Sequence, residues 1–244
     1  MSDREEKSLT EKKLTLANED NAIYQNGQTT IGKEIHLMTI IGEIEGHENL
    51  ESTSKTTKYE HILPKLAEIE GNSEVKGILV LLNTMGGDVE AGLSIAEMIA
   101  SMSKPSVSLV LGGSHSIGVP IAVSTNYSFI VPTGTMVIHP VRTNGMVLGV
   151  SQTFDYFKKI QDRITGFVSS HSKISKQKLE RLMLETGVLT KDMGTILIGH
   201  EAVEQGLIDD VGGISAAVDK LMLMIRENEK TVKNRGIAGV LKRG

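Results

Sequence analysis

The chain of 244 residues contains no cysteine and no tryptophan, and aromatic residues make up only 3% of it. The absence of cysteine excludes disulfides, thiolate metal ligands and a cysteine nucleophile. Proteins that stack nucleic-acid bases use aromatic side chains on a basic surface. With so few rings and a formal net charge of -4, the chain does not fit that class, and we expect no nucleic-acid partner.

Long apolar runs are equally scarce, and none approaches the length that crosses a bilayer. The first residues, MSDREEKSLTEKK, are densely charged and lack the apolar stretch of a secretory signal. We therefore expect a cytoplasmic protein without a transmembrane segment. The seven histidines include no pair at a spacing typical of zinc sites, and no metal or organic cofactor is suggested.

Composition changes twice along the chain. Residues 1–30 are polar, which predicts a flexible N-terminal arm. Residues 31–224 carry the apolar patterns of a single folded domain, without an internal linker. Residues 225–244 are polar and basic, which predicts a solvated helix end and tail.

Apolar runs alternate with helical periodicities inside this domain. Continuous apolar runs, typical of strands buried on both faces, predict strands at 35–44, 77–83 and 107–113. Helical spacing predicts helices at 59–70, 88–102, 116–124 and about 150–172. Pro64 predicts a late start or a bend in the first of them. This alternation indicates an α/β fold on a mainly parallel sheet.

The segment NTMGGDVEAG, residues 83–92, joins a predicted strand to a predicted helix through a glycine pair. Adjacent glycines let the backbone approach a ligand closely, and the free N–H groups of a helix start favour developing negative charge. Asp88 is expected to cap the helix. Glycine pairs also occur in ordinary strand-to-helix turns, so this segment alone fits a tight turn or an oxyanion hole.

The segment LGGSHSIGVP, residues 111–120, places Ser116 where the next helix is expected to begin. Most such serines are N-caps. The functional alternative is a nucleophile at a strand-to-helix turn, where the helix N-terminus stabilises the anion formed during attack. Ser114 competes for that role on composition alone.

The segment MVIHP, residues 136–140, ends a predicted strand in His139. A lone histidine at a strand end is usually structural, but a serine peptidase needs an imidazole of near-neutral pKa within hydrogen-bond reach of its serine. The two strand-to-helix turns are expected at one edge of the sheet. Backbone N–H groups of Gly87 and Ile117 are then expected to converge on one oxygen, as acyl transfer requires.

Together these segments resemble the Clp protease proteolytic subunit family. NTMGGDVEAG is similar to the family's N-S-P-G-G-x-V-x-A-G, GGSHSIG to G-x-A-A-S-M-G, MVIHP to M-I-H-Q-P, and EAVEQGLID to E-A-x-E-Y-G-L-I-D. The four segments keep the family's order and span residues 83–209. Within the family, the chain resembles the translocation-enhancing TepA group of Clp-like proteins.

The resemblance implies a ClpP/crotonase-like spiral of repeated ββα units and a serine endopeptidase. It implies Ser116 as nucleophile, His139 as general base, and the backbone N–H groups of Gly87 and Ile117 as oxyanion donors. Residues 142–150 would correspond to the strand and turn beside the cleft. Peptide or protein substrates and a homo-oligomer are also implied, and an ATPase commonly delivers substrate to members of the family.

Three positions depart from the family pattern. Met85 stands for proline before the glycine pair, and His115 stands for alanine before the nucleophile. The family's catalytic aspartate falls on Gly194, in a stretch several residues longer than usual. Asp192, two positions away, is predicted to complete a Ser–His–Asp triad.

Two other functions remain open on this fold. A crotonase-like hydratase or isomerase acts on acyl-CoA thioesters through carboxylates, and Asp88 is the only carboxylate at the two expected oxyanion turns. A Clp-like scaffold without activity, retained for binding or assembly, would carry the same segments. A serine-reactive fluorophosphonate probe separates the three, because only the peptidase should label at Ser116.

Overall fold

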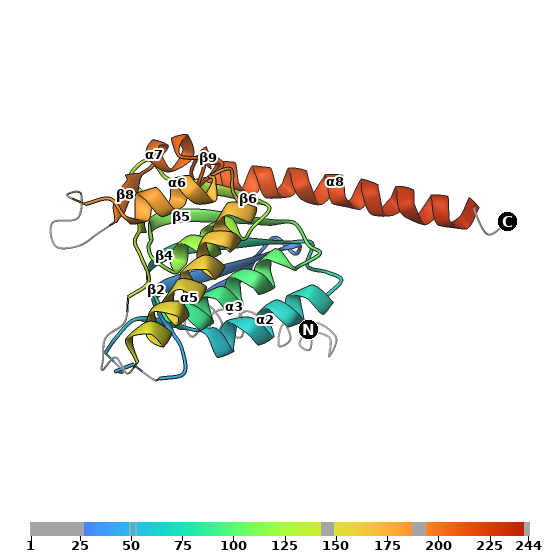
Figure 1. The fold of residues 1–244 in the computed structure, drawn as a ribbon. Coiled ribbons are helices and arrows are strands. Elements are labelled where there is room, and N and C mark those ends of the chain that lie inside the picture. Colours follow the sequence, from blue (N-terminus) through green and yellow to red (C-terminus); the bar gives the residue numbers. More distant parts are fainter. Residues whose placement is uncertain (1–26, 49, 52, 143–148, 187–193, 242–244) are drawn as a thin grey trace.

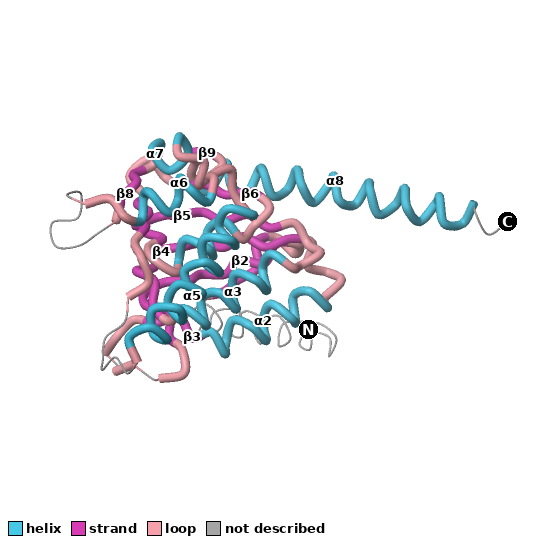
Figure 2. The backbone as a smooth tube through the Cα atoms, viewed as in Figure 1, coloured by secondary structure: helices cyan, strands magenta, loops and turns pink. Residues whose placement is uncertain are grey.

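The backbone is organised around one mixed β-sheet. The computed structural model describes residues 27–48, 50–51, 53–142, 149–186 and 194–241. The strands in these ranges are β1 (Gln28–Ile31), β2 (Ile35–Glu45), β3 (Thr56–Lys58), β4 (Gly77–Gly87), β5 (Ser106–Ser114), β6 (Tyr127–Ile130), β7 (Thr135–Ile138), β8 (Thr195–Ile198) and β9 (Asp210–Val211). The main path of the sheet runs β1-β2-β4-β5-β6-β9. Figure 2 shows the strands in magenta with the helices around them in cyan.

Helices connect the central strands and cover the sheet. They are α2 (Tyr59–Gly71), α3 (Val89–Ala100), α4 (Gly118–Val123), α5 (Val150–Ser170), α6 (Lys176–Met183), α7 (His200–Glu204) and α8 (Ile214–Leu241). In Figure 1, α2, α3 and α5 lie across the same face of the sheet. Helix α8 packs on the opposite face through Ala217, Leu221 and Ile225, and its far end projects beyond the sheet.

Strand direction agrees with the crossover connections. β2, β4, β5 and β6 are parallel neighbours, and β1 is antiparallel to β2. Successive residues of the central strands face opposite sides, so Val80 and Leu82 pack under α2, α3 and α4 while Leu79 packs under α8. The predicted α/β fold with a mainly parallel sheet is thus confirmed.

Off the main path, β7 turns the chain toward the site. β7 touches β5 in parallel at Gly113 and Thr135, and pairs with β8 in the antiparallel sense. Since β5 leads to Ser116 and β7 leads to His139, the pairing of these two strands sets the distance between the predicted nucleophile and the predicted base.

The structure corrects several expected boundaries. Helix α2 begins at Tyr59, before Pro64, so the late start is wrong; burial of Ile62, Leu66 and Ile69 outweighs the hydrogen bond that proline cannot donate. β4 runs on through Gly87 instead of ending at Asn83, because β2 continues beside it.

Parts of the expected arm and of the expected tail lie in regular secondary structure. The last residues of the expected arm, 28–30, belong to β1, which pairs with β2. The expected start of the tail at 225 falls inside α8. Among the helices in the described part of the chain, none combines the length and apolar character that a bilayer crossing demands.

Candidate active site

Ser116 occupies a strained turn between β5 and α4. Its φ is 55°, and within the described ranges no other non-glycine residue has a positive φ. A serine in this left-handed conformation costs roughly 1–3 kcal/mol, which the surrounding contacts must offset. The Ser116 N–H donates to the Val137 carbonyl at 2.8 Å, and the Gly118 N–H donates to the His115 carbonyl at 2.8 Å.

The helix-capping interpretation of Ser116 is wrong. Ile117 stands at the N-cap of α4, and no side chain caps that helix. Ser114 instead has a structural role, because it is completely buried and its hydroxyl donates to the Gly118 carbonyl at 2.7 Å. Of the two candidate serines, only Ser116 is partly exposed and held in the conformation of a nucleophile turn.

The glycine pair packs directly against this turn. Gly86 and Gly87 have φ values of 92° and 149°, a region that favours glycine. A Cβ on Gly86 would lie 2.8 Å from Ser116 Cβ, and one on Gly87 would lie 2.2 Å from the Ile44 carbonyl oxygen. The same Gly86 position is 3.2 Å from the Ile117 nitrogen, so the end of β4 and the start of α4 meet as predicted.

Asp88 has the capping role expected of it. Its Oδ1 accepts the Ala91 N–H at 2.8 Å at the start of α3. Because its carboxylate is engaged in the helix cap, Asp88 is poorly placed to take part in the carboxylate chemistry of a crotonase-like enzyme.

His139 follows β7 and is half-buried. Its Nδ1 lies 2.7 Å from the carbonyl oxygen of Pro140. A carbonyl only accepts hydrogen bonds, so Nδ1 carries the proton of this contact and Nε2 is the basic nitrogen of the neutral ring. The ring is therefore in the tautomer that a general base for Ser116 requires.

A cavity of about 160 Å³ joins these parts. Ser116, His139, Gly87 and Ile117 all line it. Its remaining walls are Val89, Val119, Ile138, Pro140, Val141, Arg142, Ile164, Val168, Leu179 and Met183. The described lining is predominantly apolar and contains no aspartate or glutamate, which disfavours catalysis through carboxylates there.

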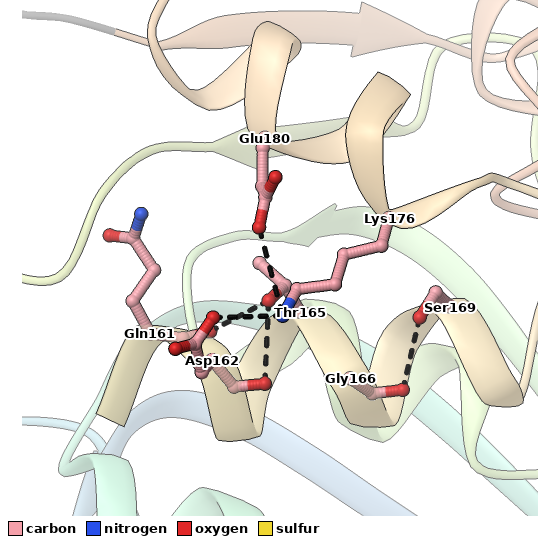
Figure 3. Close-up of polar contacts among 7 residues, drawn as sticks. All are labelled: Gln161, Asp162, Thr165, Gly166, Ser169, Lys176 and Glu180. Atoms are coloured by element: carbon pink, nitrogen blue, oxygen red, sulfur yellow. Dashed lines mark hydrogen bonds and ion pairs between the residues drawn. The ribbon is translucent and has the colours of Figure 1, made fainter. Parts of the chain in front are cut away.

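Helices α5 and α6 supply apolar side chains to the wall of this cavity. On their polar sides, an ion pair connects the two helices. The Nζ of Lys176 lies 2.8 Å from Asp162 Oδ1 and 3.8 Å from Glu180 Oε1 (Figure 3). Hydrogen bonding and charge from Lys176 lower the pKa of Asp162. Of these two, only the pair with Asp162 joins α6 to α5, and as an exposed ion pair it contributes little stability. The packing of the two helices rests mainly on their buried apolar residues.

Asp192, the predicted third member of the triad, lies outside the described residues, as do residues 143–148 of the expected strand and turn. Gly194, the position that matches the family's aspartate, has a φ of 136° and donates its N–H to the Glu185 carbonyl at 2.8 Å. In the described ranges, no group of three or more histidine, aspartate or glutamate side chains is arranged to hold a metal ion.

Two contributors to the site are not apparent from the sequence. The Pro140 carbonyl is a backbone atom, and only the orientation of the His139 ring reveals it. His115, a departure from the family pattern, places its Nε2 2.8 Å from the Thr135 hydroxyl on β7. The one signal in the sequence for this contact was a polar residue at a position where the family has alanine.

Comparisons with known proteins identify the family of the chain. A family model described as Clp protease matches residues 33–215. The chain belongs to the Clp protease family. It is 56% identical over 211 residues to the translocation-enhancing protein TepA of Halalkalibacterium halodurans, an alignment that covers 85% of this chain and 82% of that protein.

Members named as protease subunits are more distant. The ATP-dependent Clp protease proteolytic subunit of Leuconostoc citreum is 28% identical over 62% of this chain and 74% of its own length. Subunit 1 of the same enzyme from Protochlamydia amoebophila is 26% identical over 62% of this chain and 72% of its own length. The predicted family and its TepA-like character are therefore confirmed.

Proposed function

We propose that the chain is a serine endopeptidase that cleaves peptide bonds through an acyl-enzyme, with Ser116 as nucleophile and His139 as general base. The observation that carries this proposal is the left-handed backbone of Ser116 at the cavity that His139 also lines. Backbone strain at a non-glycine residue clusters at functional sites because the surrounding structure must maintain it.

In the first half-reaction, the Ser116 oxygen attacks the peptide carbonyl carbon while His139 Nε2 takes the hydroxyl proton. Negative charge then develops on the carbonyl oxygen. The N–H groups of Gly87 and Ile117 are the proposed donors to it, at the point where β4 and α4 meet. The C–N bond breaks as His139 returns the proton to the leaving amine.

In the second half-reaction, a water molecule replaces the amine. His139 takes a proton from the water, which attacks the acyl carbon, and the Ser116 oxygen then leaves with that proton. The cycle restores both residues. The Pro140 carbonyl supports the mechanism by holding Nδ1 through both proton transfers.

The cavity suggests the side chain that precedes the cleaved bond. Its walls from α5 and α6 are Ile164, Val168, Leu179 and Met183, all apolar. Burial of an apolar side chain there gains about 25 cal/mol per Å² of surface removed from water. We therefore expect cleavage after medium-sized apolar residues.

The test is labelling with a fluorophosphonate probe followed by peptide hydrolysis. The intact chain should label at Ser116, and Ser116→Ala should abolish both labelling and hydrolysis while its melting temperature stays at or above that of the parent chain. An unlabelled intact chain would favour the alternative of a Clp-like scaffold without activity. The relative from Halalkalibacterium halodurans is named for enhancing translocation and not for proteolysis, which is why this alternative is worth testing.

We also propose that the chain assembles with copies of itself. Phe154 and Tyr156 on α5 are 68% and 58% exposed, although aromatic residues are rare in the sequence. Ile41, Met85 and Leu111 add exposed apolar surface on neighbouring strands. Use of an ATPase partner and a cytoplasmic location stay predictions.

A further inference from the structure

His115 connects the nucleophile turn to the strand that carries the proposed base. Its Nε2 lies 2.8 Å from the Thr135 hydroxyl oxygen, and that hydroxyl lies 3.3 Å from the Gly112 carbonyl oxygen. Gly113 makes room for the ring, since a Cβ there would lie 2.6 Å from His115 Nε2. The imidazole therefore fills the space between the end of β5 and the start of β7.

Two backbone contacts join the same two segments as this side-chain contact. Gly113 and Thr135 are paired residues of β5 and β7, and the Ser116 N–H donates to the Val137 carbonyl at 2.8 Å. The described register of β5 with β7 is a single residue pair, which is little backbone pairing for two strands that lead to the proposed nucleophile and the proposed base. The hydrogen bond between His115 and Thr135 is therefore a substantial part of the polar contact between these two segments.

The charge state of His115 suits this position. Burial lowers the pKa of His115, and the nearby His139 lowers it further. The ring is therefore neutral near pH 7 and adds no positive charge beside His139 when that residue becomes an imidazolium. A lysine or arginine at this position would repel the imidazolium and slow proton transfer.

We propose that His115 is a positioning residue, whose hydrogen bond to Thr135 fixes β7, and with it the His139 ring, relative to Ser116. This role rests on the proposed peptidase function for its kinetic consequence, but its geometric consequence can be measured without turnover. The contact between His139 Nδ1 and the Pro140 carbonyl should depend on the same support.

The test compares four variants of the full chain. His115→Ala and Thr135→Val each remove the hydrogen bond between the two side chains, and Thr135→Val also removes the contact of the Thr135 hydroxyl with the Gly112 carbonyl. The double variant lacks both contacts. His115→Gln replaces the imidazole with an amide N–H donor at a similar reach. Thr165→Val is the matched control, because the Thr165 hydroxyl donates within its own helix at 3.0 Å from the Gln161 carbonyl oxygen.

Imidazole nitrogen NMR gives the readout that does not require activity. In the intact chain, His139 should be protonated at Nδ1. His115→Ala and Thr135→Val should each give a mixture of both tautomers, while His115→Gln and Thr165→Val should keep the parent spectrum. A role confined to stability would lower the melting temperature without changing this tautomer.

Kinetics give the second readout. Each single variant should lower kcat about tenfold with little change in KM, because a misaligned base affects the transition state more than substrate binding. The double variant should be no slower than Thr135→Val alone, because His115 has no hydrogen-bond partner at position 135 once that hydroxyl is absent. His115→Gln should recover most of the parent rate.

The outcomes separate the two proposals. Parent-like tautomer and parent-like kcat in His115→Ala would overturn the role of His115, even if Ser116 labels normally. Additive losses in the double variant would overturn it too. If the intact chain fails to label, the peptidase function fails, and the NMR comparison alone then supports or refutes positioning by His115.

Discussion

His139 Nδ1 and the carbonyl oxygen of the residue that follows it, Pro140, lie 2.7 Å apart. A backbone carbonyl can hold the imidazole in one tautomer, but it has no full negative charge. The carboxylate of a triad does both: it orients the ring and stabilises the imidazolium formed during attack. If Asp192 supplies that charge, its mutation should affect charge stabilisation while the Pro140 carbonyl still orients the ring.

Asp192→Asn tests the contribution of charge. We expect turnover to fall at least about 100-fold, since loss of the triad aspartate can cost on the order of 10⁴ in rate. Fluorophosphonate labelling should slow in parallel, with an almost unchanged melting temperature. Turnover within a few-fold of the parent would mean that the Pro140 carbonyl suffices, and that Asp192 takes no part in catalysis.

Ser114→Ala is the matched control for the nucleophile. It removes the hydroxyl that donates to the Gly118 carbonyl in the core. We expect a loss of about 1–2 kcal/mol in the free energy of unfolding, because a buried acceptor loses its donor. Labelling at Ser116 should persist. A stable Ser114→Ala variant that fails to label would indicate that the nucleophile has been assigned to the wrong serine.

Gly86→Ala should damage the site from the neighbouring strand. The new Cβ would lie 2.8 Å from both Ser116 Cβ and the His115 carbonyl oxygen, at a φ of 92°. We expect a destabilisation of roughly 1–3 kcal/mol in chemical denaturation and loss of labelling.

Gly166→Ala is the glycine control on α5. Apart from its chain neighbours and the backbone of its own helix, no atom lies within 4 Å of the added Cβ, and the helical backbone accepts alanine. Its free energy of unfolding should rise by about 0.5–1 kcal/mol, with labelling unchanged. Equal loss of labelling in the two glycine variants would contradict a specific role for the Gly86 turn.

Self-association should depend on the exposed aromatic residues of α5. Sedimentation at micromolar concentration should show species larger than a monomer. Replacing Phe154 and Tyr156 together by serine should shift the distribution toward smaller species, because the variant buries less apolar surface between copies. Replacing Lys158 and Lys159 by serine is the control on the same helix. A monomer across a range of salt would count decisively against assembly.

Acid should destabilise the β1 edge through His36. Burial, with a smaller contribution from Lys65 and an opposing one from Glu68, lowers the pKa of His36 from 6.5 to about 4. Between those two values the unfolded chain binds the additional proton, so stability falls as the pH falls through this window. The linked loss of unfolding free energy is at most about 3.5 kcal/mol, at about 1.4 kcal/mol per pKa unit.

Comparison with His36→Gln isolates this effect from the carboxylates, which titrate in both proteins. Glutamine does not titrate, so the unfolding free energy of the variant should fall less between pH 7 and pH 4. Parallel curves for the two proteins would show that His36 does not carry the linkage.

Much of the fold follows from local patterns. The continuous apolar run of β4 and the helical stripe of α3 are signals within one segment, and Asp88 marks the boundary between them. β1 escaped prediction because its residues are mostly polar and gain stability from pairing with β2 and from the contact of Gln28 with His36. Tertiary pairing, and not local pattern, makes that strand.

The site divides in the same way. Family motifs were sufficient to choose Ser116 and His139, but a capping serine and a nucleophile serine share the same local sequence. The difference arises from contacts with distant residues, such as the Ser116 N–H bond to Val137. The partner of His139 Nδ1 depends on a side-chain torsion, which no sequence pattern encodes.

The left-handed backbone at Ser116 has a consequence for directed evolution. Glycine is the residue that adopts this conformation without strain. A library screened only for resistance to heat would therefore favour glycine at position 116, and the same change would remove the hydroxyl on which the proposed chemistry depends. At this position, selection for thermostability and selection for catalysis draw the sequence in opposite directions.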